Sequence, residues 1–200
     1  MASILVVCTG NVCRSPIAEG MLRSILQTRF GDAAPSVASA GTAGWVGSAA
    51  DPSSIAAAAE LGIDITAHRA RHLDHHDVAD AALVLAMATE HRDAASRLFP
   101  GTVGRIFTLK ELVRLLEDLP QAPPRGKPDD VLASQVSAVD ASRFGAIRDW
   151  RHEEGVMDPL GMPPEAFRAV ARDLEEWCGR LVDGLFGRAP ARTAAATEGD

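Results

Sequence analysis

The sequence predicts an α/β protein, with a three-layer α/β/α arrangement around a twisted sheet of four parallel strands. Two observations support this prediction. Short apolar segments without polar alternation recur along the chain, which is typical of strands buried on both faces of a parallel sheet. Segments with apolar residues at helical spacing lie between them, and strands that alternate with helices indicate βαβ units. The 200 residues are enough for one domain with a sizeable core, and no internal repeat divides them.

The first strand is expected at residues 4–7, an uninterrupted apolar run. A polar loop follows at residues 9–14. Ser15 with Pro16 behind it then favours a helix, with the serine as N-cap and the proline at the first helical position. One face of this helix carries the apolar atoms of Ala18, Met21, Leu22, Ile25 and Arg29. The chain thus opens as a strand, a short loop and a helix.

The same alternation continues to residue 119. Further strands are expected at residues 36–40, 82–87 and 105–108. Further helices are expected at residues 52–61, 90–98 and 109–119. Gly41 ends the second strand, and Asp51 or Ser48 is the candidate N-cap of the helix that follows it.

The pattern is weakest at residues 119–157, which we interpret as an extended loop or insertion. Prolines at residues 121–128 favour a loop there, and residues 131–139 are the one segment in it with a helical pattern.

Clear helical spacing returns after Pro163 and Pro164. The apolar stripe of this last helix consists of Phe167, Val170, Ala171, Leu174, Cys178, Leu181 and Leu185. Cys178 is therefore expected in the core. We predict a single domain at residues 1–187 and a disordered tail at residues 188–200, where the chain is small and polar.

The composition argues against some classes of function. A net charge of −7 disfavours binding to nucleic acid, which needs a basic face. The first ten residues lack the positive region and the longer apolar run of a signal peptide, and no segment reaches the roughly 20 apolar residues of a membrane span. The protein is therefore expected in the cytoplasm and away from membranes, where its three cysteines stay reduced.

A histidine-rich segment at residues 72–77 invites interpretation as a metal site, because His72 and His76 are four residues apart. The segment is polar and precedes a strand, so a solvated loop is the preferred interpretation. We predict no metal site in this segment.

The loop after the first strand has the spacing Cys-x5-Arg-Ser, which runs from Cys8 to Arg14 and Ser15. A helix N-terminus presents free N–H groups and a partial positive charge, and a short loop can curl these groups around a tetrahedral dianion. Gly10 and Asn11 are residue types that tolerate the left-handed turn such a loop needs. The guanidinium of Arg14 matches two phosphoryl oxygens. The sequence therefore predicts a phosphate-binding loop.

Cys8 is expected below the centre of this loop, where the N–H groups and Arg14 favour a nucleophilic thiolate. Ser15 can donate a hydrogen bond to the sulfur and steady it as a leaving group. Attack on phosphorus also needs an acid to protonate the departing oxygen, and Asp158 is our candidate. Its loop is expected at the carboxyl edge of the sheet, where the first loop also lies.

Two alternatives to this assignment of the acid are open. An aspartate before a proline is also common in ordinary turns, and Pro159 follows Asp158. The neighbouring acidic residues that compete for the role are Asp149, Glu153 and Glu154.

Residues 8–19, CTGNVCRSPIAE, resemble the signature of the low-molecular-weight protein tyrosine phosphatases of bacterial type. Further residues match that family in the same order along the chain. They are Ser39, Thr42, Trp45, Asp51, Pro52, Gly62, Ile63, His68, Arg71, Met87, Asp158 and Pro159. The resemblance covers residues 3–118 and 156–186.

This resemblance implies a protein-tyrosine phosphatase that hydrolyses phosphate monoesters through a phosphocysteine intermediate. It assigns Cys8 as the nucleophile, Arg14 as the phosphate clamp, and Asp158 as general acid and then general base. The implied substrate- and phosphate-binding residues are Thr9, Gly10, Asn11, Val12, Cys13, Ser15 and Trp45. Among them, the residues implied to line the pocket for the substrate's ring are Thr9, Val12 and Trp45.

The resemblance also implies a hydrogen-bond network that holds the loop in shape. Its implied members are Asn11, Ser15, Ser39 and His68. The implied partners are phosphotyrosine proteins, among them a bacterial tyrosine kinase, because bacterial members oppose the tyrosine kinases of polysaccharide export. No metal or cofactor is implied.

The chain departs from the family pattern where the substrate would bind. It contains no tyrosine, and Leu160 and Gly161 stand where the family places one or two aromatic residues. Ala88, Thr89 and Glu90 replace the acidic residue that commonly follows the methionine. Trp45 is interpreted as a pocket residue, with core packing as its alternative.

Cys13 has two interpretations. It is either a packing residue at the rim of the loop or, as in similar proteins, the partner of a reversible disulfide with Cys8 that protects the nucleophile from over-oxidation.

Two functions other than phosphatase activity are open from the sequence. The first is arsenate reduction on the same fold with an external thiol. It is disfavoured because the chain has no cysteine between Cys13 and Cys178 to shuttle a disulfide. The second is a non-catalytic phosphate-binding module, which the retention of nucleophile, clamp and acid disfavours.

Overall fold

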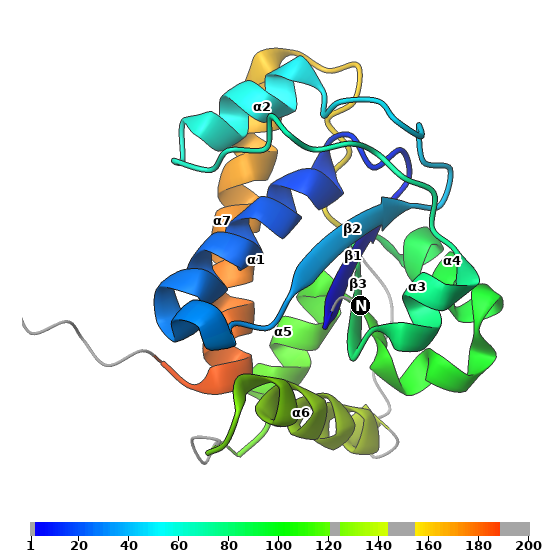
Figure 1. The fold of residues 1–200 in the computed structure, drawn as a ribbon, viewed down its shortest axis with the longest axis vertical. Coiled ribbons are helices and arrows are strands. Elements are labelled where there is room, and N and C mark those ends of the chain that lie inside the picture. The colour runs from blue at the N-terminus through cyan, green and yellow to red at the C-terminus, as the bar shows by residue number, and fades with distance from the viewer. Residues whose placement is uncertain (1–2, 121–124, 144–154, 189–200) are drawn as a thin grey trace, which may run out of the picture.

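The computed structural model describes residues 3–120, 125–143 and 155–188, and four parallel strands form a sheet at its centre (Figure 1). The strands are β1 (Ile4–Cys8), β2 (Val37–Gly41), β3 (Leu83–Ala86) and β4 (Ile106–Thr108). Their spatial order is β2-β1-β3-β4. The predicted α/β fold with four parallel strands is therefore confirmed.

Strand β1 is central and fixes the level of the loops around it. Its Cys8 pairs with Gly41 of β2, and its Val7 pairs with Ala86 of β3. Because all strands run in the same direction, the loops that follow them start side by side at one edge of the sheet. This edge carries the candidate site.

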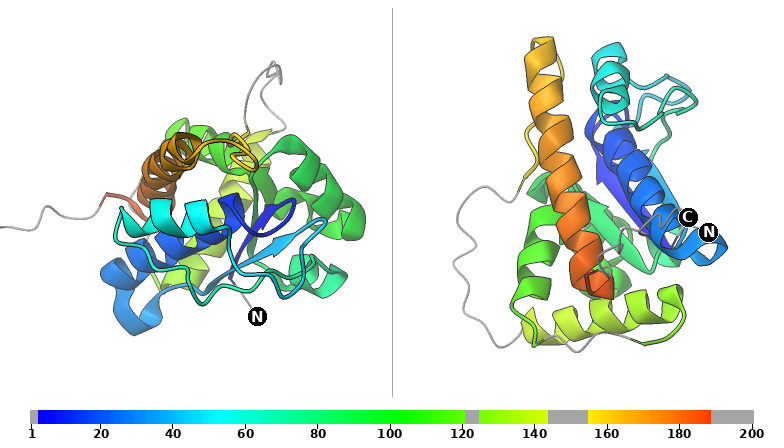
Figure 2. Two further views of the ribbon diagram at one scale, coloured as in Figure 1. Left: turned by 90° about the horizontal axis from the view of Figure 1, so that it is seen from above. Right: turned by 90° about the vertical axis from the view of Figure 1, so that its left-hand side faces the viewer.

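Helices cover both faces of the sheet, as Figures 1 and 2 show. One side carries α1 (Arg14–Phe30), α2 (Pro52–Ala59), α5 (Leu109–Glu117) and α7 (Pro164–Phe186). The other side carries α3 (His75–Asp80) and α4 (Thr89–Leu98). Successive residues of a strand point to opposite faces. Accordingly, Val6 and Cys8 pack with α1 and α7, whereas Leu5 and Val7 pack with α3 and α4.

The strands and helices predicted before residue 119 are present, with ends that differ by a residue or two. Two short 3₁₀ helices, at Gly31–Ala33 and Pro100–Arg105, were not anticipated. Of the two candidate caps for α2, Asp51 is the actual one, because its carboxylate accepts hydrogen bonds from the backbone N–H groups of Ser53 and Ser54.

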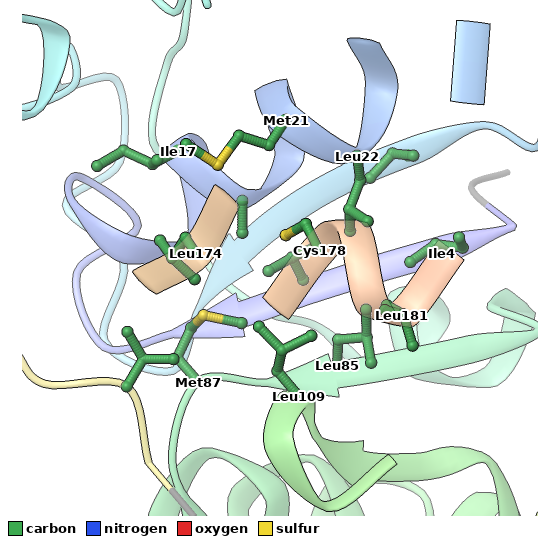
Figure 3. Packing of buried hydrophobic residues seen from close by; sticks show 14 of the residues in the cluster. Ile4, Ile17, Met21, Leu22, Leu85, Met87, Leu109, Leu174, Cys178 and Leu181 are labelled. Carbon is green, nitrogen blue, oxygen red and sulfur yellow. The ribbon is translucent and has the colours of Figure 1, made fainter. Parts of the chain in front are cut away.

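Helix α7 carries the predicted apolar stripe, whose seven members are all buried. Figure 3 shows Cys178 between Leu174 and Leu181 of α7 and facing Leu22 of α1. Burial raises the pKa of the Cys178 thiol to about 12. Cys178 is thus a core residue, as predicted, and it stays protonated at neutral pH.

The prediction that Ser15 caps the first helix is wrong. Helix α1 begins at Arg14, two residues before the expected Pro16, and its N-cap residue Cys13 makes no side-chain capping bond. The Ser15 hydroxyl lies instead between Cys8 Sγ and the side-chain amide of Asn11. A serine side chain that serves the loop in this way is no longer available to the helix terminus.

The prediction of an extended loop or insertion at residues 119–157 is wrong for its central part. Residues Pro128–Arg143 form helix α6, which includes the segment at 131–139 where the sequence has a helical pattern. Its buried face consists of Val131, Leu132, Val136 and Val139. Burial of this apolar stripe against α5 and α7 favours a helix over a loop. Asp149, Glu153, Glu154 and the tail at 189–200 lie outside the described residues, and the domain limits at 1–187 stay a prediction.

The interpretation of residues 72–77 as a solvated loop is also wrong in part, because α3 begins at His75. Asp74 caps it, Asp77 returns the bond in a capping box, and Val78 is buried beneath it. Within the described ranges, no group of three or more His, Cys, Asp and Glu side chains is placed to hold a metal ion. In the same ranges, no helix is both long enough and apolar enough to cross a membrane.

Candidate active site

Asn11 gives the loop after β1 its shape. Its φ of +57° makes it the one non-glycine residue in the described ranges with a left-handed backbone. Its side chain is fully used: Nδ2 donates to Ser15 Oγ at 2.9 Å and to Ser39 Oγ at 2.8 Å, and Oδ1 accepts from the Arg71 N–H at 2.9 Å. These bonds hold the strained residue in place. The left-handed turn therefore lies at Asn11 alone, because Gly10 is not among the glycines with positive φ.

A second tier of side chains holds Asn11. The Ser39 hydroxyl donates to Glu19 Oε2 at 2.6 Å, and His68 Nε2 lies 2.8 Å from the Asn11 carbonyl oxygen. Because a carbonyl oxygen only accepts, His68 carries its hydrogen on Nε2. The structure thus joins the four network residues expected from the sequence. Sequence reasoning missed Glu19, although its position one helical turn after Ser15 was a usable signal.

Cys8 ends β1 and is buried, with its Sγ 2.9 Å from Ser15 Oγ. Ser15 Oγ already accepts a hydrogen from Asn11, so the Ser15 hydrogen is free to donate to the sulfur. A donor to sulfur stabilises its anion. The chain of hydrogen bonds from Glu19 through Ser39 and Asn11 therefore ends on the Cys8 sulfur.

Arg14 is the first residue of α1 and is 4% exposed. Its Nη1 donates to the Val156 carbonyl at 3.2 Å, and its Nη2 donates to Thr9 Oγ1 at 3.4 Å and to Asp158 Oδ2 at 2.6 Å. Its Nε is buried and has no protein partner among the described residues. A buried guanidinium with an unused N–H group is suited to accept an anion.

Asp158 lies in the loop before α7 and contacts Arg14 from there. Its side chain is 45% exposed, and its Oδ1 accepts from the Leu160 N–H at 3.2 Å in a turn. The loop is attached to the sheet, because the Val156 N–H donates to the carbonyl oxygen of Met87 at 2.7 Å. The structure therefore brings Asp158 together with Arg14, as the sequence predicted from the carboxyl edge.

Cys13 is buried at the N-cap of α1 and is free of any disulfide. Burial, with smaller contributions from the charges of Asp51 and Asp158, raises its pKa to about 12. The Cys13 thiol is thus protonated at neutral pH. Packing explains its place, and its redox pairing with Cys8 stays a prediction.

Trp45 lies on the rim of the loop. Its N–H donates to the Gly10 carbonyl at 3.0 Å, its indole flanks Gly10, and its side chain is 52% exposed. Leu160 and Met157, on the loop that carries Asp158, are also exposed. Of the three residues expected to line a ring pocket, Thr9 and Trp45 are exposed and Val12 is packed in the core. The rim is therefore apolar, and Trp45 is not a core residue.

His91 is a site residue that sequence reasoning missed. It lies in the first turn of α4, 1% exposed, with its Nε2 2.8 Å from Thr9 Oγ1. Burial, and then the positive charge of Arg14, lower its pKa to about 4. The imidazole is therefore neutral at pH 7. Its position directly after β3 places it at the carboxyl edge, which was the available signal.

The lowered pKa of His91 predicts a loss of stability in mild acid. Between pH 6.5 and 4 the unfolded chain binds a proton at this histidine that the folded chain does not, so stability falls as the pH falls. We expect wild type to lose about 2–3 kcal/mol over this range relative to His91→Gln. Urea unfolding of both proteins at pH 7, 5.5 and 4 measures the difference. A constant difference across these pH values would contradict the prediction.

Comparison with known proteins supports the geometry. A sequence model of the family described as low molecular weight phosphotyrosine protein phosphatase matches residues 3–121. The probable low molecular weight protein-tyrosine-phosphatase EpsP of Ralstonia solanacearum is 37% identical over 139 residues, which cover 70% of this chain and 92% of EpsP. A protein-arginine-phosphatase of Geobacillus stearothermophilus is 30% identical over 182 residues, which cover 91% and 95% of the two chains.

The probable low molecular weight protein-tyrosine-phosphatase AmsI of Erwinia amylovora is similar in sequence and in structure. It is 38% identical over 183 residues, which cover 92% of this chain and 96% of AmsI. The crystal structure of AmsI superposes with a TM-score of 0.67 and 26% identity, covering 94% of this chain and 95% of that one. The similarity therefore extends over the whole sheet and its helices.

Proposed function

Since this chain belongs to the low molecular weight phosphotyrosine protein phosphatase family and is a phosphatase, we propose that Cys8, Arg14 and Asp158 carry out its reaction. One observation supports this assignment above all others. At the carboxyl edge of the sheet, one loop carries a buried cysteine that receives a hydrogen bond and ends in a buried arginine, and that arginine holds an aspartate from a distant loop at 2.6 Å. The nucleophile and the clamp thus come from one loop, and the acid joins the clamp from a segment far along the chain.

Substrate binding starts at Arg14. The phosphoryl dianion takes the guanidinium and the N–H groups of the loop at the start of α1 as its donors. The dianion replaces the Asp158 carboxylate on Nη2. Asp158 takes up a proton from solvent as it leaves the guanidinium, and it then faces the oxygen that leaves.

The Cys8 thiolate attacks the phosphorus atom. The sulfur–phosphorus bond forms as the bond from phosphorus to the leaving oxygen breaks, and Asp158 gives its proton to that oxygen. The donor on Ser15 stabilises the sulfur. In the second step Asp158 removes a proton from water, the resulting oxygen attacks phosphorus, and phosphate departs as the Cys8 thiolate is restored.

We assign phosphotyrosine in proteins as the substrate group, because Trp45 presents an exposed aromatic ring at the rim of the loop. An aromatic pair adds about 0.5–1.5 kcal/mol beyond the area that it buries. The candidate protein substrates include a bacterial tyrosine kinase. The enzyme is placed in the cytoplasm, where reducing conditions keep Cys8 available as a thiol.

A second candidate substrate group is phosphoarginine. Leu160 and Gly161, in the loop that carries Asp158, are not aromatic, and one relative is named a protein-arginine-phosphatase. Arsenate reduction is not favoured, because the relatives described above are named as phosphatases and Cys178 is buried too deeply to take part in a disulfide shuttle.

A peptide series tests the substrate assignment. Peptides of one sequence that carry phosphotyrosine, phosphoserine, phosphothreonine or phosphoarginine would be compared with wild type, Trp45→Ala and the control Val46→Ala. We expect phosphotyrosine to be the best substrate. We expect Trp45→Ala to lower kcat/KM on it by about 3- to 10-fold, with inhibition by inorganic phosphate unchanged and Val46→Ala close to wild type. A preference for phosphoarginine that survives Trp45→Ala would overturn the assignment.

A further inference from the structure

We propose that His91 is a positioning residue for the phosphate site, which acts through Thr9 to orient the Thr9 hydroxyl and the Arg14 guanidinium. The proposal rests on the proposed role of Arg14 as the phosphate clamp. Two loops contact the Arg14 side chain directly, one at Thr9 and one at Val156 and Asp158. The proposal adds helix α4, which carries His91, as a third element that supports Arg14.

The geometry places the imidazole behind the loop and out of contact with solvent. His91 is 1% exposed, and its Nε2 lies 2.8 Å from Thr9 Oγ1. The same oxygen lies 3.4 Å from Arg14 Nη2. Thr9 itself is exposed to solvent. Through these two contacts, Thr9 connects the buried histidine to the clamp.

The single N–H hydrogen of the neutral His91 imidazole can form a hydrogen bond from only one of the two ring nitrogens. His91 Nδ1 is buried and has no partner among the described residues, whereas Nε2 faces an oxygen. A hydrogen on Nδ1 would be a buried donor without an acceptor, which is rare in proteins. We therefore assign the hydrogen to Nε2, from which it is donated to Thr9 Oγ1. The low pKa given above means that no second hydrogen competes at neutral pH.

The consequence for Thr9 follows from counting its hydrogen-bonding positions. A hydroxyl oxygen has two lone pairs, and His91 Nε2 and Arg14 Nη2 each donate to it. Its own hydrogen is then left to point away from both donors. We infer that it is donated to a phosphoryl oxygen held by Arg14. A neutral histidine also supports the guanidinium without adding a repelling positive charge beside it.

The test compares His91→Leu, which fills the space without a donor, with His91→Gln, whose amide can reach the Nε2 position. Thr9→Val and the double variant complete a cycle, and Ser96→Ala on the far part of α4 is the control for helix packing. The measurements are kcat and KM on p-nitrophenyl phosphate, the inhibition constant of inorganic phosphate, and the thermal midpoint of each protein.

We expect His91→Leu and Thr9→Val each to weaken phosphate inhibition and kcat/KM about tenfold, in line with the loss of one hydrogen bond that serves a charged group. His91→Gln should recover most of this loss. In the Thr9→Val background, His91→Leu should cost nothing further, because the link is already cut. Nitrogen-15 NMR of the imidazole should show Nε2 protonated at pH 7.

The proposal is wrong if the two losses multiply, if His91→Gln is no better than His91→Leu, or if only the thermal midpoint moves. It is also wrong if Thr9→Val keeps the wild-type phosphate inhibition, and this variant stays informative if His91→Leu does not fold, because Thr9 is exposed. Failure of the proposed function itself is visible separately, as absent turnover in wild type and in Ser96→Ala.

Discussion

Cys8→Ser is expected to have no measurable turnover on p-nitrophenyl phosphate or on phosphotyrosine peptides. Serine keeps the shape of the side chain and its hydrogen bond to Ser15, but its hydroxyl stays protonated where a thiol can ionise. Loss of a nucleophile costs on the order of 10⁴- to 10⁶-fold in kcat. The same variant should still bind inorganic phosphate, because Arg14 and the N–H groups of the loop remain.

The matched control is Cys13→Ser, the same replacement at the other end of the loop. The pKa of the Cys13 thiol is raised to about 12, so its thiol does not ionise at neutral pH and should not act in turnover. Cys13→Ser is expected to keep kcat within about threefold of wild type, since burial of one extra polar group is its main cost. Steady-state kinetics and phosphate binding by calorimetry separate the two variants. Turnover by Cys8→Ser near the wild-type rate would mean that another group attacks phosphorus.

The loop could be predicted from the sequence because its parts are contiguous. Cys8 and Arg14 are six residues apart, and a strand that runs into a helix leaves few conformations for the residues between them. The four strands were predictable for a related reason. An apolar run such as residues 4–7 is buried on both faces only in a parallel sheet, and Val6 and Val7 do pack on opposite faces.

The contacts that the sequence did not predict depend on parts of the chain that meet only when the sheet has formed. Thr9 lies in the loop after β1 and His91 lies in the first turn of α4, and nothing local indicates that one faces the other. For Ser15, the local sequence pattern predicted a role that the fold does not use. Locally it is a good N-cap residue, but in the fold its hydroxyl is shared by Cys8 and Asn11. The preference of serine for the N-cap position is overridden there, because the loop uses the Ser15 hydroxyl as a hydrogen-bond donor to Cys8.

Helix α6 was underestimated for a different reason. Its apolar residues are few, and prolines before it suggested a loop. Pro128 is in fact the first residue of the helix, where a proline costs no hydrogen bond, and Asp129 and Asp130 follow it where negative charge is favourable. The same segment contributes Arg143, which pairs with the buried Glu111 of α5 at 2.8 Å. The segment is therefore a part of the folded body.

Asp158→Ala is the second large effect, and its size should depend on the leaving group. General acid catalysis is worth about 10²- to 10⁴-fold, and it matters most when the departing oxygen is strongly basic. We expect a loss of about tenfold or less on p-nitrophenyl phosphate and of at least about 10²-fold on phenyl phosphate and phosphotyrosine peptides. Binding of inorganic phosphate should be unchanged or tighter, because the variant frees Arg14 from the carboxylate that it holds at 2.6 Å.

Asp158→Asn separates the acid from the turn that carries it. The amide keeps an oxygen for the Leu160 N–H and so preserves the geometry of the loop, but it has no proton to give. If Asp158 is the acid, Asp158→Asn and Asp158→Ala show the same dependence on the leaving group in a series of substituted phenyl phosphates. If Asp158 only shapes the loop, the asparagine variant works like wild type. Equal losses on all leaving groups, or none, would place the acid on another side chain, because a proton donor alone makes the rate respond to the basicity of the oxygen that departs.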